Sequence, residues 1–595
     1  MKTFDNEKFL RQLNLEKEQL SLGYEKKSKI LEDNILSSRE SSNFYGVALL
    51  KKYIEPLSIS IKNEIEKNKK SKGRKNDALK FLEEFENIEI VAYLSLRQVL
   101  NSISNEISLS KLSISIGNLL DKELQIYKLK KEYPEIYKKI EKFYNKKTEN
   151  YRYLYVNKIL KEKKLYHKSS SSNLKVQVGT KLIDIISSSL NIIKINITID
   201  KWTSKQINTV SATKECLNMI KDYKNNILLT PEYLPMIVPP KNWTNPYNGG
   251  YYSFEKQLYL VKARFDEKKY LSFLDENKEN MPILYNSINA LQNTAFKINK
   301  KVLNVMTEMY EKSIGDILPK KVAKKLPVCP ICNKNVETNN KKDKHICFLN
   351  KENKEKFIKW KKEADEVKSY NNSLFGKQIQ ISKILYLAHK FRDEDEIYFP
   401  YQLDFRGRAY AVTSYLQPQG SDFAKGLLTF AVKLPLIDFD SVKWLAIYGA
   451  NLYGNDKISY DDRLLWVLEN EENIIESAKN PLKNTWWTKA DKPFQFLAFV
   501  FEWNEYIESC LKEEVFYSSL PIAMDGTCNG LQIFSILTRD KDAGIATNLI
   551  DSTKPMDIYG VVAEKVIKTL EYKKLKGEIK YKKDNKNILY DEKIL

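Results

Sequence analysis

The chain has 595 residues, of which 42% are hydrophobic and 12% aromatic, so it is long enough for several domains with large cores. Its 98 Lys and Arg residues against 77 Asp and Glu give a formal net charge of +21. This surplus favours a polyanionic partner such as nucleic acid, although a composition rich in Lys, Asn and Ile also contributes to it. Six Cys residues in this length exclude a disulfide scaffold, and no apolar run is long enough to cross a bilayer, so we expect no membrane association.

Residues 1 to about 165 predict long, charged helices with few Pro and Gly residues. A basic stretch from Lys69 to Asp77 interrupts them, and it is either a solvated loop or a loop that rests on phosphates or enters a minor groove. The alternation of Ile193, Ile195, Ile197 and Ile199 with polar residues predicts a strand and a nearby hairpin. A Pro- and Gly-rich connection over residues 235–252 indicates a domain boundary.

Apolar residues at roughly heptad spacing between Ile288 and Met309 predict one long packing helix. A second charged helical region is expected from about Lys351 to Arg392. From Tyr398 onward, Gly, Pro and aromatic residues become more frequent, as is typical of a mixed α+β domain that carries a site.

A short stretch holds Cys329, Cys332, His345 and Cys347. Cys329-x₂-Cys332 is a frequent half of a Zn²⁺ site, and His345-x-Cys347 offers a second half. The sequence therefore suggests a structural zinc ion, with free thiols in a solvated loop as the alternative.

Three blocks in the C-terminal half carry candidate chemistry. In YFPYQLDFRGRAYAV (398–412), Arg406 and Arg408 are expected to point the same way from an extended segment and to bind phosphates, or else to form a structural network with Asp404. In LQPQGSDFAKGLLTFA (416–431), Lys425 is expected at the start of an apolar helix, where it meets phosphate or solvent. The aromatic run around Trp486 and residues 494–503 is expected in the core rather than as stacking platforms.

The most informative segment is LPIAMDGTCNGLQIFSILTRD (520–540). An apolar strand over residues 520–524 is expected to deliver Asp525 to its exposed end, followed by a turn and a helix that packs through Leu531, Phe534 and Leu537. A carboxylate held in this way can bind Mg²⁺, and Gly526 allows close approach to the backbone.

These blocks follow one another in the order and spacing of the bacteriophage-type single-subunit RNA polymerases, a family of phage and mitochondrial enzymes that this chain resembles. The resemblance also covers SINALQNTAFKINKKVL (287–303), VPPKNWT with GGYY, and DIYGVVAEKV (557–566). It spans most of the chain, most strongly residues 235–570. A family A DNA polymerase is a weaker alternative, because none of its motifs is evident.

The resemblance implies an α-rich α+β fold: a right-hand polymerase with thumb, first part of the palm and start of the fingers, preceded by a helical N-terminal domain. The expected domains are residues 1–235 (helical, for promoter and nascent RNA), 236–300 (connection), 301–395 (thumb, with a Cys/His insert at 326–350), 396–541 (first part of the palm) and 542–595 (start of the fingers).

The resemblance also implies template-dependent joining of ribonucleoside triphosphates with two Mg²⁺ ions. Asp525 matches the family's first catalytic aspartate, and the Gly526 carbonyl is an additional metal ligand. Lys457 matches a lysine near the incoming triphosphate, and Tyr559 a tyrosine near the template base. The remaining matches are a nucleotide and hybrid group, Arg406, Arg408, Tyr410 and Lys425, and a loop that contacts AT-rich upstream DNA, Lys72, Arg74 and Lys75.

The chain departs from the family pattern after the DIYG block. A fingers helix for nucleotide selection and a second catalytic aspartate, which follow that block in the family, are not found before Leu595. Because one carboxylate holds two metal ions poorly, we expect this fragment not to polymerise RNA alone; the alternative function is a non-catalytic remnant that binds promoter or hybrid. Ile533 stands where family members often carry His.

The expected partners are double-stranded promoter and template DNA, nascent RNA and ribonucleoside triphosphates, with the protein as a monomer. The first 20 residues lack an apolar signal core and contain acidic residues that argue against a transit peptide. The expected location is therefore a mitochondrion, with the gene in the organelle or on a linear plasmid, and the alternative is a virus in the host cytoplasm.

Overall fold

The computed structural model describes residues 6–137, 156, 170–199, 206–228, 231–253, 258–262, 267–314, 317–319, 322–331, 333, 354–523, 526–550, 555–576, 581–583 and 589–591. The chain divides into two compact units. One comprises Lys17–Glu232, and the other comprises Met1–Glu16 together with Tyr233–Leu595. We refer to them as the N-terminal unit and the C-terminal unit and describe each by itself. The finer boundaries expected for thumb, palm and fingers stay predictions.

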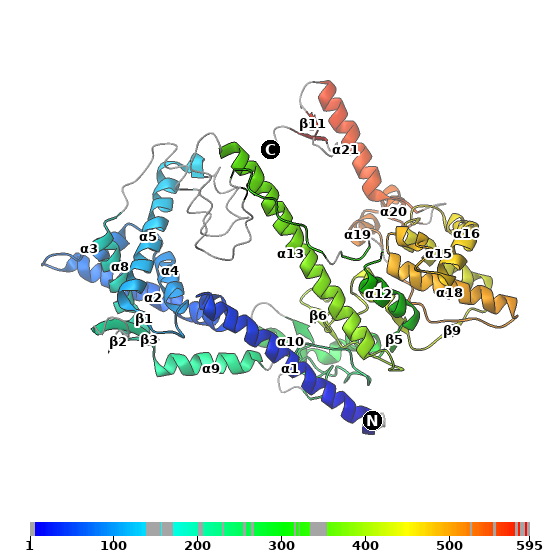
Figure 1. The fold of residues 1–595 in the computed structure, drawn as a ribbon, viewed down its shortest axis with the longest axis horizontal. Helices are drawn as coiled ribbons and strands as arrows, with labels where there is room; N and C mark the ends of the chain where they lie inside the picture. Colours follow the sequence, from blue (N-terminus) through cyan, green and yellow to red (C-terminus); the bar gives the residue numbers. More distant parts are fainter. Residues whose placement is uncertain are drawn as a thin grey trace. The chain divides into compact units, whose positions relative to one another are not determined.

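The N-terminal unit is mainly helical, with one small sheet (Figure 1). Its helices are most of α1 (Asn6–Leu36), then η1 (Glu40–Ser42), α2 (Phe44–Lys70), α3 (Asp77–Glu83), α4 (Ile88–Leu100), α5 (Leu109–Glu132), α8 (Ser172–Leu190) and α9 (Lys214–Leu228). The sheet has the antiparallel order β1 (Ile107–Ser108), β3 (Gln206–Ala212), β2 (Ile193–Ile199), which confirms the strand predicted from the alternating Ile residues.

Helices α5 and α8 cross with their backbones in unusually close approach. A Cβ atom on Gly117 would lie 2.6 Å from the carbonyl carbon of Lys175, and one on Gly179 would lie 2.6 Å from that of Ser113. Each helix therefore offers a glycine to the backbone of the other. The buried apolar side chains of α2, α3 and α4 join α5 and α8 in one core.

The C-terminal unit contains many helices and several short strands. Its helices are α10 (Glu267–Glu276), η2 (Lys278–Asn280), α11 (Pro282–Gln292), α12 (Lys300–Lys312), α13 (Lys354–Lys390), α14 (Asp422–Gly426), α15 (Phe439–Tyr453), α16 (Tyr460–Glu469), α17 (Glu471–Lys479), η5 (Trp486–Lys489), α18 (Pro493–Leu511), α19 (Asn529–Thr538), α20 (Lys541–Ala546) and α21 (Ile558–Leu575). Helix α13 confirms the predicted second charged helix.

The strands of this unit form small separate sheets. They are β4 (Val261–Lys262), β6 (Tyr401–Asp404) and β7 (Ala409–Ala411); β5 (Phe296–Ile298) with β8 (Leu428–Phe430); β9 (Leu434–Pro435) with β10 (Tyr517–Ser518); and β11 (Tyr581–Lys583) with β12 (Leu589–Asp591). Only the β4–β6 pair is parallel among these described strands. The predicted α-rich α+β fold is confirmed. No helix of the described residues combines the length and apolarity needed to cross a membrane.

The single helix predicted between Ile288 and Met309 is wrong. Helix α11 ends at Gln292, strand β5 follows, and α12 begins at Lys300, where the Asn299 side chain accepts a hydrogen bond from the Val302 amide at 3.2 Å. Most of the spaced apolar residues are buried, among them Ile288, Val302 and Met309, whereas Leu291 is 45% exposed. Non-local strand pairing of β5 with β8 and an asparagine cap divide the segment, and neither is visible in a heptad count.

The aromatic run is confirmed as core. Trp487, Phe496, Phe499 and Trp503 are at most 1% exposed, and they pack along α18. Trp486 is half-buried, with its ring centroid 4.9 Å from that of Tyr453. Helix α18 is therefore the buried scaffold against which the candidate site is built.

Candidate active site and nucleic-acid interface

The two arginines of the Arg-Gly-Arg block lie in a tight turn between β6 and β7. The Asp404 carboxylate accepts hydrogen bonds from the backbone N–H groups of Arg406 at 2.9 Å and Arg408 at 3.0 Å. It also accepts two from the Arg406 guanidinium, at 2.8 and 2.6 Å. Gly407 takes a φ of +81° at this turn. The prediction of an extended segment is therefore wrong, and the Arg406 guanidinium is turned back onto Asp404.

This turn has a fixed electrostatic arrangement. Partial desolvation opposes ionisation of Asp404, but hydrogen bonds from Arg408 and Arg406 outweigh it and hold the pKa of Asp404 below its ordinary value. The hydrogen bonds that Arg406 donates to Asp404 in turn raise the pKa of the Arg406 guanidinium. Arg406 thus forms the structural network that was the alternative to phosphate binding. Arg408 and Tyr410 remain exposed beside it, so this surface keeps a cation and an aromatic ring for a ligand.

Lys425 lies on a short helix that is braced by α18. Helix α14 ends at Gly426 and leads into β8, so the expected apolar helix beginning at Lys425 is wrong. A Cβ atom on Gly426 would lie 2.6 Å from the carbonyl oxygen of Phe494, so the end of α14 packs directly on the α18 backbone. One turn earlier, Asp422 accepts hydrogen bonds from the amides of Phe494 at 3.0 Å and Gln495 at 3.1 Å, which caps α18.

A cavity of about 90 Å³ places Lys425 beside the segment that leads to Asp525. Its walls include Tyr448, Gln495 and residues 520–523. Burial raises the pKa of Tyr448 to about 12, so its hydroxyl stays protonated here. Met524 and Asp525 lie outside the described residues. The strand expected over 520–524 is wrong for the described residues 520–523: pairing ends with β10 and the Ser519 carbonyl, which accepts the Phe430 amide at 2.9 Å, and Pro521 has no N–H for a ladder.

We expect Asp422→Asn to loosen the beginning of α18 and the wall beneath Lys425. The substitution removes the charge and one of two acceptor oxygens, so it should cost about 1–3 kcal/mol locally. Hydrogen exchange at the Phe494 and Gln495 amides measures this. Asp440→Asn is the matched control, because Asp440 is an exposed carboxylate in the first turn of α15. Equal protection in both variants would contradict the capping role.

The turn after Asp525 contacts the helix that carries Tyr559. The Cys528 thiol donates to the Tyr559 hydroxyl at 2.8 Å, across 31 positions of sequence. Helix α19 is present as predicted, but Leu531, Phe534 and Leu537 are 49%, 61% and 77% exposed. The expected packing of this face is therefore wrong for the described residues. Periodicity indicated the helix correctly but could not tell what covers it.

Lys457 lies in the loop between α15 and α16 and is exposed, with its ammonium 3.4 Å from the Asp456 carboxylate. It is not among the residues that line the cavity. Its predicted contact with a triphosphate stays a prediction.

The Cys/His cluster is described only in part. Cys329 is fully buried and packs against Trp360 and Ala364 of α13. The indole N–H of Trp360 donates a hydrogen bond to the Pro327 carbonyl oxygen at 2.9 Å. Cys332, His345 and Cys347 lie outside the described residues. Within the described part of the chain, no three His, Cys, Asp or Glu residues are grouped so as to hold a metal ion. The zinc site stays a prediction.

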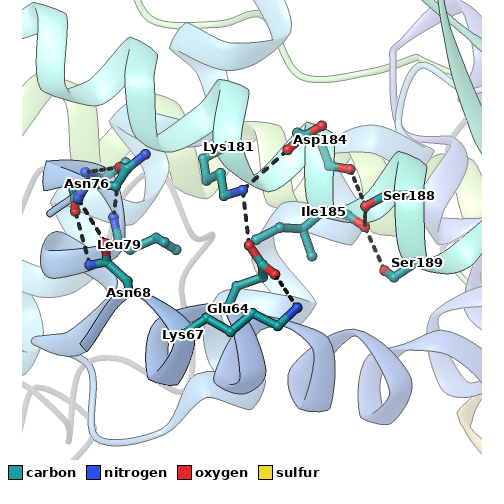
Figure 2. Close-up of polar contacts among 11 residues, drawn as sticks. Glu64, Lys67, Asn68, Asn76, Leu79, Lys181, Asp184, Ile185, Ser188 and Ser189 are labelled. Atoms are coloured by element: carbon teal, nitrogen blue, oxygen red, sulfur yellow. Dashed lines mark hydrogen bonds and ion pairs between the residues drawn. The ribbon is translucent and has the colours of Figure 1, made fainter. Parts of the chain in front are cut away.

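In the N-terminal unit, the basic loop between α2 and α3 is anchored at its base by two asparagines (Figure 2). Asn68 Oδ1 accepts the Asn76 amide at 2.9 Å, and Asn76 Oδ1 accepts the Ala78 amide at 2.9 Å, which caps α3. Lys72, Arg74 and Lys75 are all exposed between these anchors. The loop is therefore a cationic protrusion on a fixed base.

An ion-pair bridge joins α2 to α8 (Figure 2). Glu64 lies 3.0 Å from the Lys67 ammonium and 3.1 Å from that of Lys181. Hydrogen bonds from Lys67 and Lys181 lower the pKa of Glu64 from its ordinary value of 4.5. This bridge fastens the helix that precedes the loop to the core of the unit.

The lowered pKa predicts how this bridge depends on pH. A carboxylate with a lowered folded-state pKa stabilises the fold above its unfolded-state value, near pH 4.5, and that contribution is lost as the pH falls through the folded-state pKa. We expect Glu64→Gln to destabilise α2 and α8 by up to about 1 kcal/mol at pH 7 and by progressively less as the pH falls below about 4.5. Hydrogen exchange of α2 and α8 peptides tests this, with Glu66→Gln, an exposed residue of α2, as control. A pH-independent difference would refute the bridge.

The chain is similar in sequence to known proteins along most of its length. A family model described as DNA-directed RNA polymerase N-terminal matches residues 11–293, and one described as DNA-dependent RNA polymerase matches residues 436–594. T7 RNA polymerase of Escherichia phage T7 is 30% identical over 592 residues, which is 95% of this chain and 63% of that protein.

Further relatives match the chain over shorter spans. The DNA-directed RNA polymerase of Enterobacteria phage K11 is 37% identical over 352 residues, 59% of this chain and 36% of that protein. DNA-directed RNA polymerase 1, mitochondrial, of Arabidopsis thaliana is 33% identical over 344 residues, 57% of this chain and 33% of that protein. The chain thus spans less than two thirds of the length of these relatives.

Two family models cover both ends of the chain, a phage relative matches nearly all of it, and the cavity brings two of the predicted motifs together. The chain belongs to the phage-type single-subunit RNA polymerases.

Proposed function

We propose that this chain binds promoter DNA and supplies the first part of a site that joins ribonucleotides on a DNA template. The observation that supports it most is a convergence: Lys425 shares a cavity with the segment entering Asp525, and Tyr559 contacts the turn leaving it. The three motifs lie up to 134 positions apart (from 425 to 559) and were selected from sequence alone. The relatives are named RNA polymerases, which gives the reaction class.

The proposed chemistry uses two Mg²⁺ ions. The donors fit such ions, because the Asp525 carboxylate and the Gly526 carbonyl are hard oxygen ligands of the kind that Mg²⁺ takes. Bound ions would activate the 3′-hydroxyl and neutralise the leaving pyrophosphate. A cation at Lys425, half-buried in the wall of the cavity, would bind phosphate more strongly than an exposed one, since water screens it less.

Other residues have proposed binding roles around this site. Arg408 and Tyr410 offer a guanidinium and a ring to the template–RNA hybrid, with Arg406 fixing the turn. Lys457 would meet the incoming triphosphate, and Tyr559 the template base. A mitochondrial location is proposed, with a viral one as the alternative, because relatives of both kinds match the chain.

The second candidate function is a protein that holds promoter or hybrid without chemistry. It is favoured by the single carboxylate, Asp525, that the motifs provide for two metal ions. Primer extension on a preformed RNA–DNA scaffold with Mg²⁺ separates the two functions. We expect the isolated 595-residue chain to bind the scaffold but not to extend the primer. Extension that Asp525→Asn abolishes would instead establish the chain as an active polymerase, and failure to bind any scaffold would reject both functions.

A further inference from the structure

The Asn548 side chain joins the turn Gly526–Cys528 to the start of α21. Its Nδ2 donates to Thr527 Oγ1 at 3.1 Å and to the carbonyl oxygen of Met556 at 2.9 Å. Its Oδ1 accepts the backbone N–H of Met556 at 2.6 Å. One amide therefore satisfies both backbone groups of Met556, as a neighbouring strand would, and holds the turn as well.

The backbone of Asn548 is equally specific. Its φ is +57°, in the left-handed region that Asn enters more readily than most residues. The backbone N–H of Asn548 donates to the Ile545 carbonyl oxygen at 3.0 Å, so this conformation also ends α20. The position needs a left-handed backbone together with a side chain that both donates and accepts, a combination that few residue types offer.

Tyr559 makes a second, direct hydrogen bond to the same turn. It follows Met556 by three residues, in the first turn of α21, and its hydroxyl accepts the Cys528 thiol hydrogen at 2.8 Å. The residue is nevertheless 70% exposed. A tyrosine that is held at its hydroxyl and at the start of its helix, and is otherwise mostly exposed, meets the requirements of a platform for base stacking.

We propose that Asn548 is a positioning residue that holds the Tyr559 ring as a stacking platform for a template base. The inference rests on the proposed function, in which Tyr559 meets that base. Because the ring is already oriented before a base arrives, less conformational freedom is lost on binding. Without the Asn548 amide, the start of α21 is released from the turn, and the ring direction is no longer set.

The test uses the full chain and an RNA–DNA scaffold with 2-aminopurine at the first unpaired template position, because stacking on an aromatic ring quenches this fluorophore. Asn548→Gly removes the side chain and keeps the left-handed backbone, and Asn548→Asp keeps the size but removes both donated hydrogen bonds. We expect both variants to lose most of the quenching seen with the unmodified chain. The scaffold Kd, from fluorescence anisotropy, should change by no more than about twofold, because phosphate contacts dominate affinity.

Controls separate positioning from folding. Tyr559→Ala gives the fluorescence expected without a stacking platform. Asn191→Gly replaces another left-handed Asn, with φ +50°, in the N-terminal unit and should leave the quenching unchanged. Thr527→Val, which removes one of the three hydrogen bonds, should lower the quenching even if the Asn548 variants fold poorly.

Three outcomes count against the proposal, and they are distinguishable. Full quenching in Asn548→Gly, Asn548→Asp and Thr527→Val, with loss in Tyr559→Ala, overturns the positioning role alone. Scaffold binding with equal fluorescence in the unmodified chain and Tyr559→Ala overturns the platform. Absence of scaffold binding by the unmodified chain overturns the proposed function itself.

Discussion

Gly117→Ala is expected to destabilise the crossing of α5 and α8 by about 3 kcal/mol or more. The added Cβ atom would lie 2.6 Å from the Lys175 carbonyl carbon, and a backbone cannot rotate aside as a side chain can. The two helices must therefore separate, and the apolar contacts of the shared core separate with them. Hydrogen exchange of α5 and α8 peptides measures the free energy of local opening. A local measurement is needed because the two units of the chain need not unfold in one step.

Two glycines of the same chain serve as matched controls for this substitution. Gly376 lies within α13, and a Cβ atom there meets nothing within 4 Å, so Gly376→Ala should stabilise its helix by roughly 0.5–1 kcal/mol. Gly73 lies in the basic loop with equally open surroundings, and its replacement by Ala should be nearly neutral. If Gly117→Ala exchanged as slowly as the unmodified chain, the close crossing would be refuted.

Replacing Lys72, Arg74 and Lys75 together by Ala is expected to weaken binding of an AT-rich duplex about 500-fold at 0.1 M salt. Each neutralised phosphate contributes a slope of about −0.9 to the dependence of log K on log salt, so three contribute about −2.7, which is about 500-fold in K at 0.1 M relative to 1 M salt. The loop can act as a unit because Asn68 and Asn76 fix its base. Anisotropy titrations from about 0.05 to 0.3 M salt give both the affinity and the slope.

A charge-matched triple variant decides whether the loop itself makes contact. Lys51, Lys62 and Lys221 are exposed residues of the same unit, on α2 and α9, and their replacement by Ala removes the same net charge. We expect this variant to keep most of the affinity and to lower the slope by less than about 1, since long-range charge is screened at these salt concentrations. Equal losses in the two triple variants would show a diffuse electrostatic effect and reject the loop as the contact.

Much of the fold follows from local patterns in the sequence. The alternating Ile residues of β2, the aromatic face of α18 and the charged length of α13 were each predictable, because the period of a strand or helix is written in neighbouring residues. The division of residues 288–309 into two helices and a strand was not, since Phe296 pairs with Phe430, far along the chain. Local periodicity carries no information about such a partner.

The candidate site shows the same limit. Motif order identified Lys425, Tyr559 and the Asp525 block, because their spacing is a property of sequence. Asp422 and Asn548 were missed, although each holds two segments together. Asp422 reads locally as the beginning of its own helix, and only the fold shows that it caps α18. The sequence left two roles open for Arg406, and only the fold decides for the network with Asp404, which turns the side chain back within the hairpin.

Helix α19 has a practical consequence for work in solution. Five of its ten residues are large apolar side chains that are 49–77% exposed among the described residues. Exposed apolar surface of this kind favours association, so the purified protein is expected to bind hydrophobic dyes, detergents and column matrices, and to aggregate as its concentration rises. Mild detergent and dilute samples are therefore part of any fair measurement on this polypeptide.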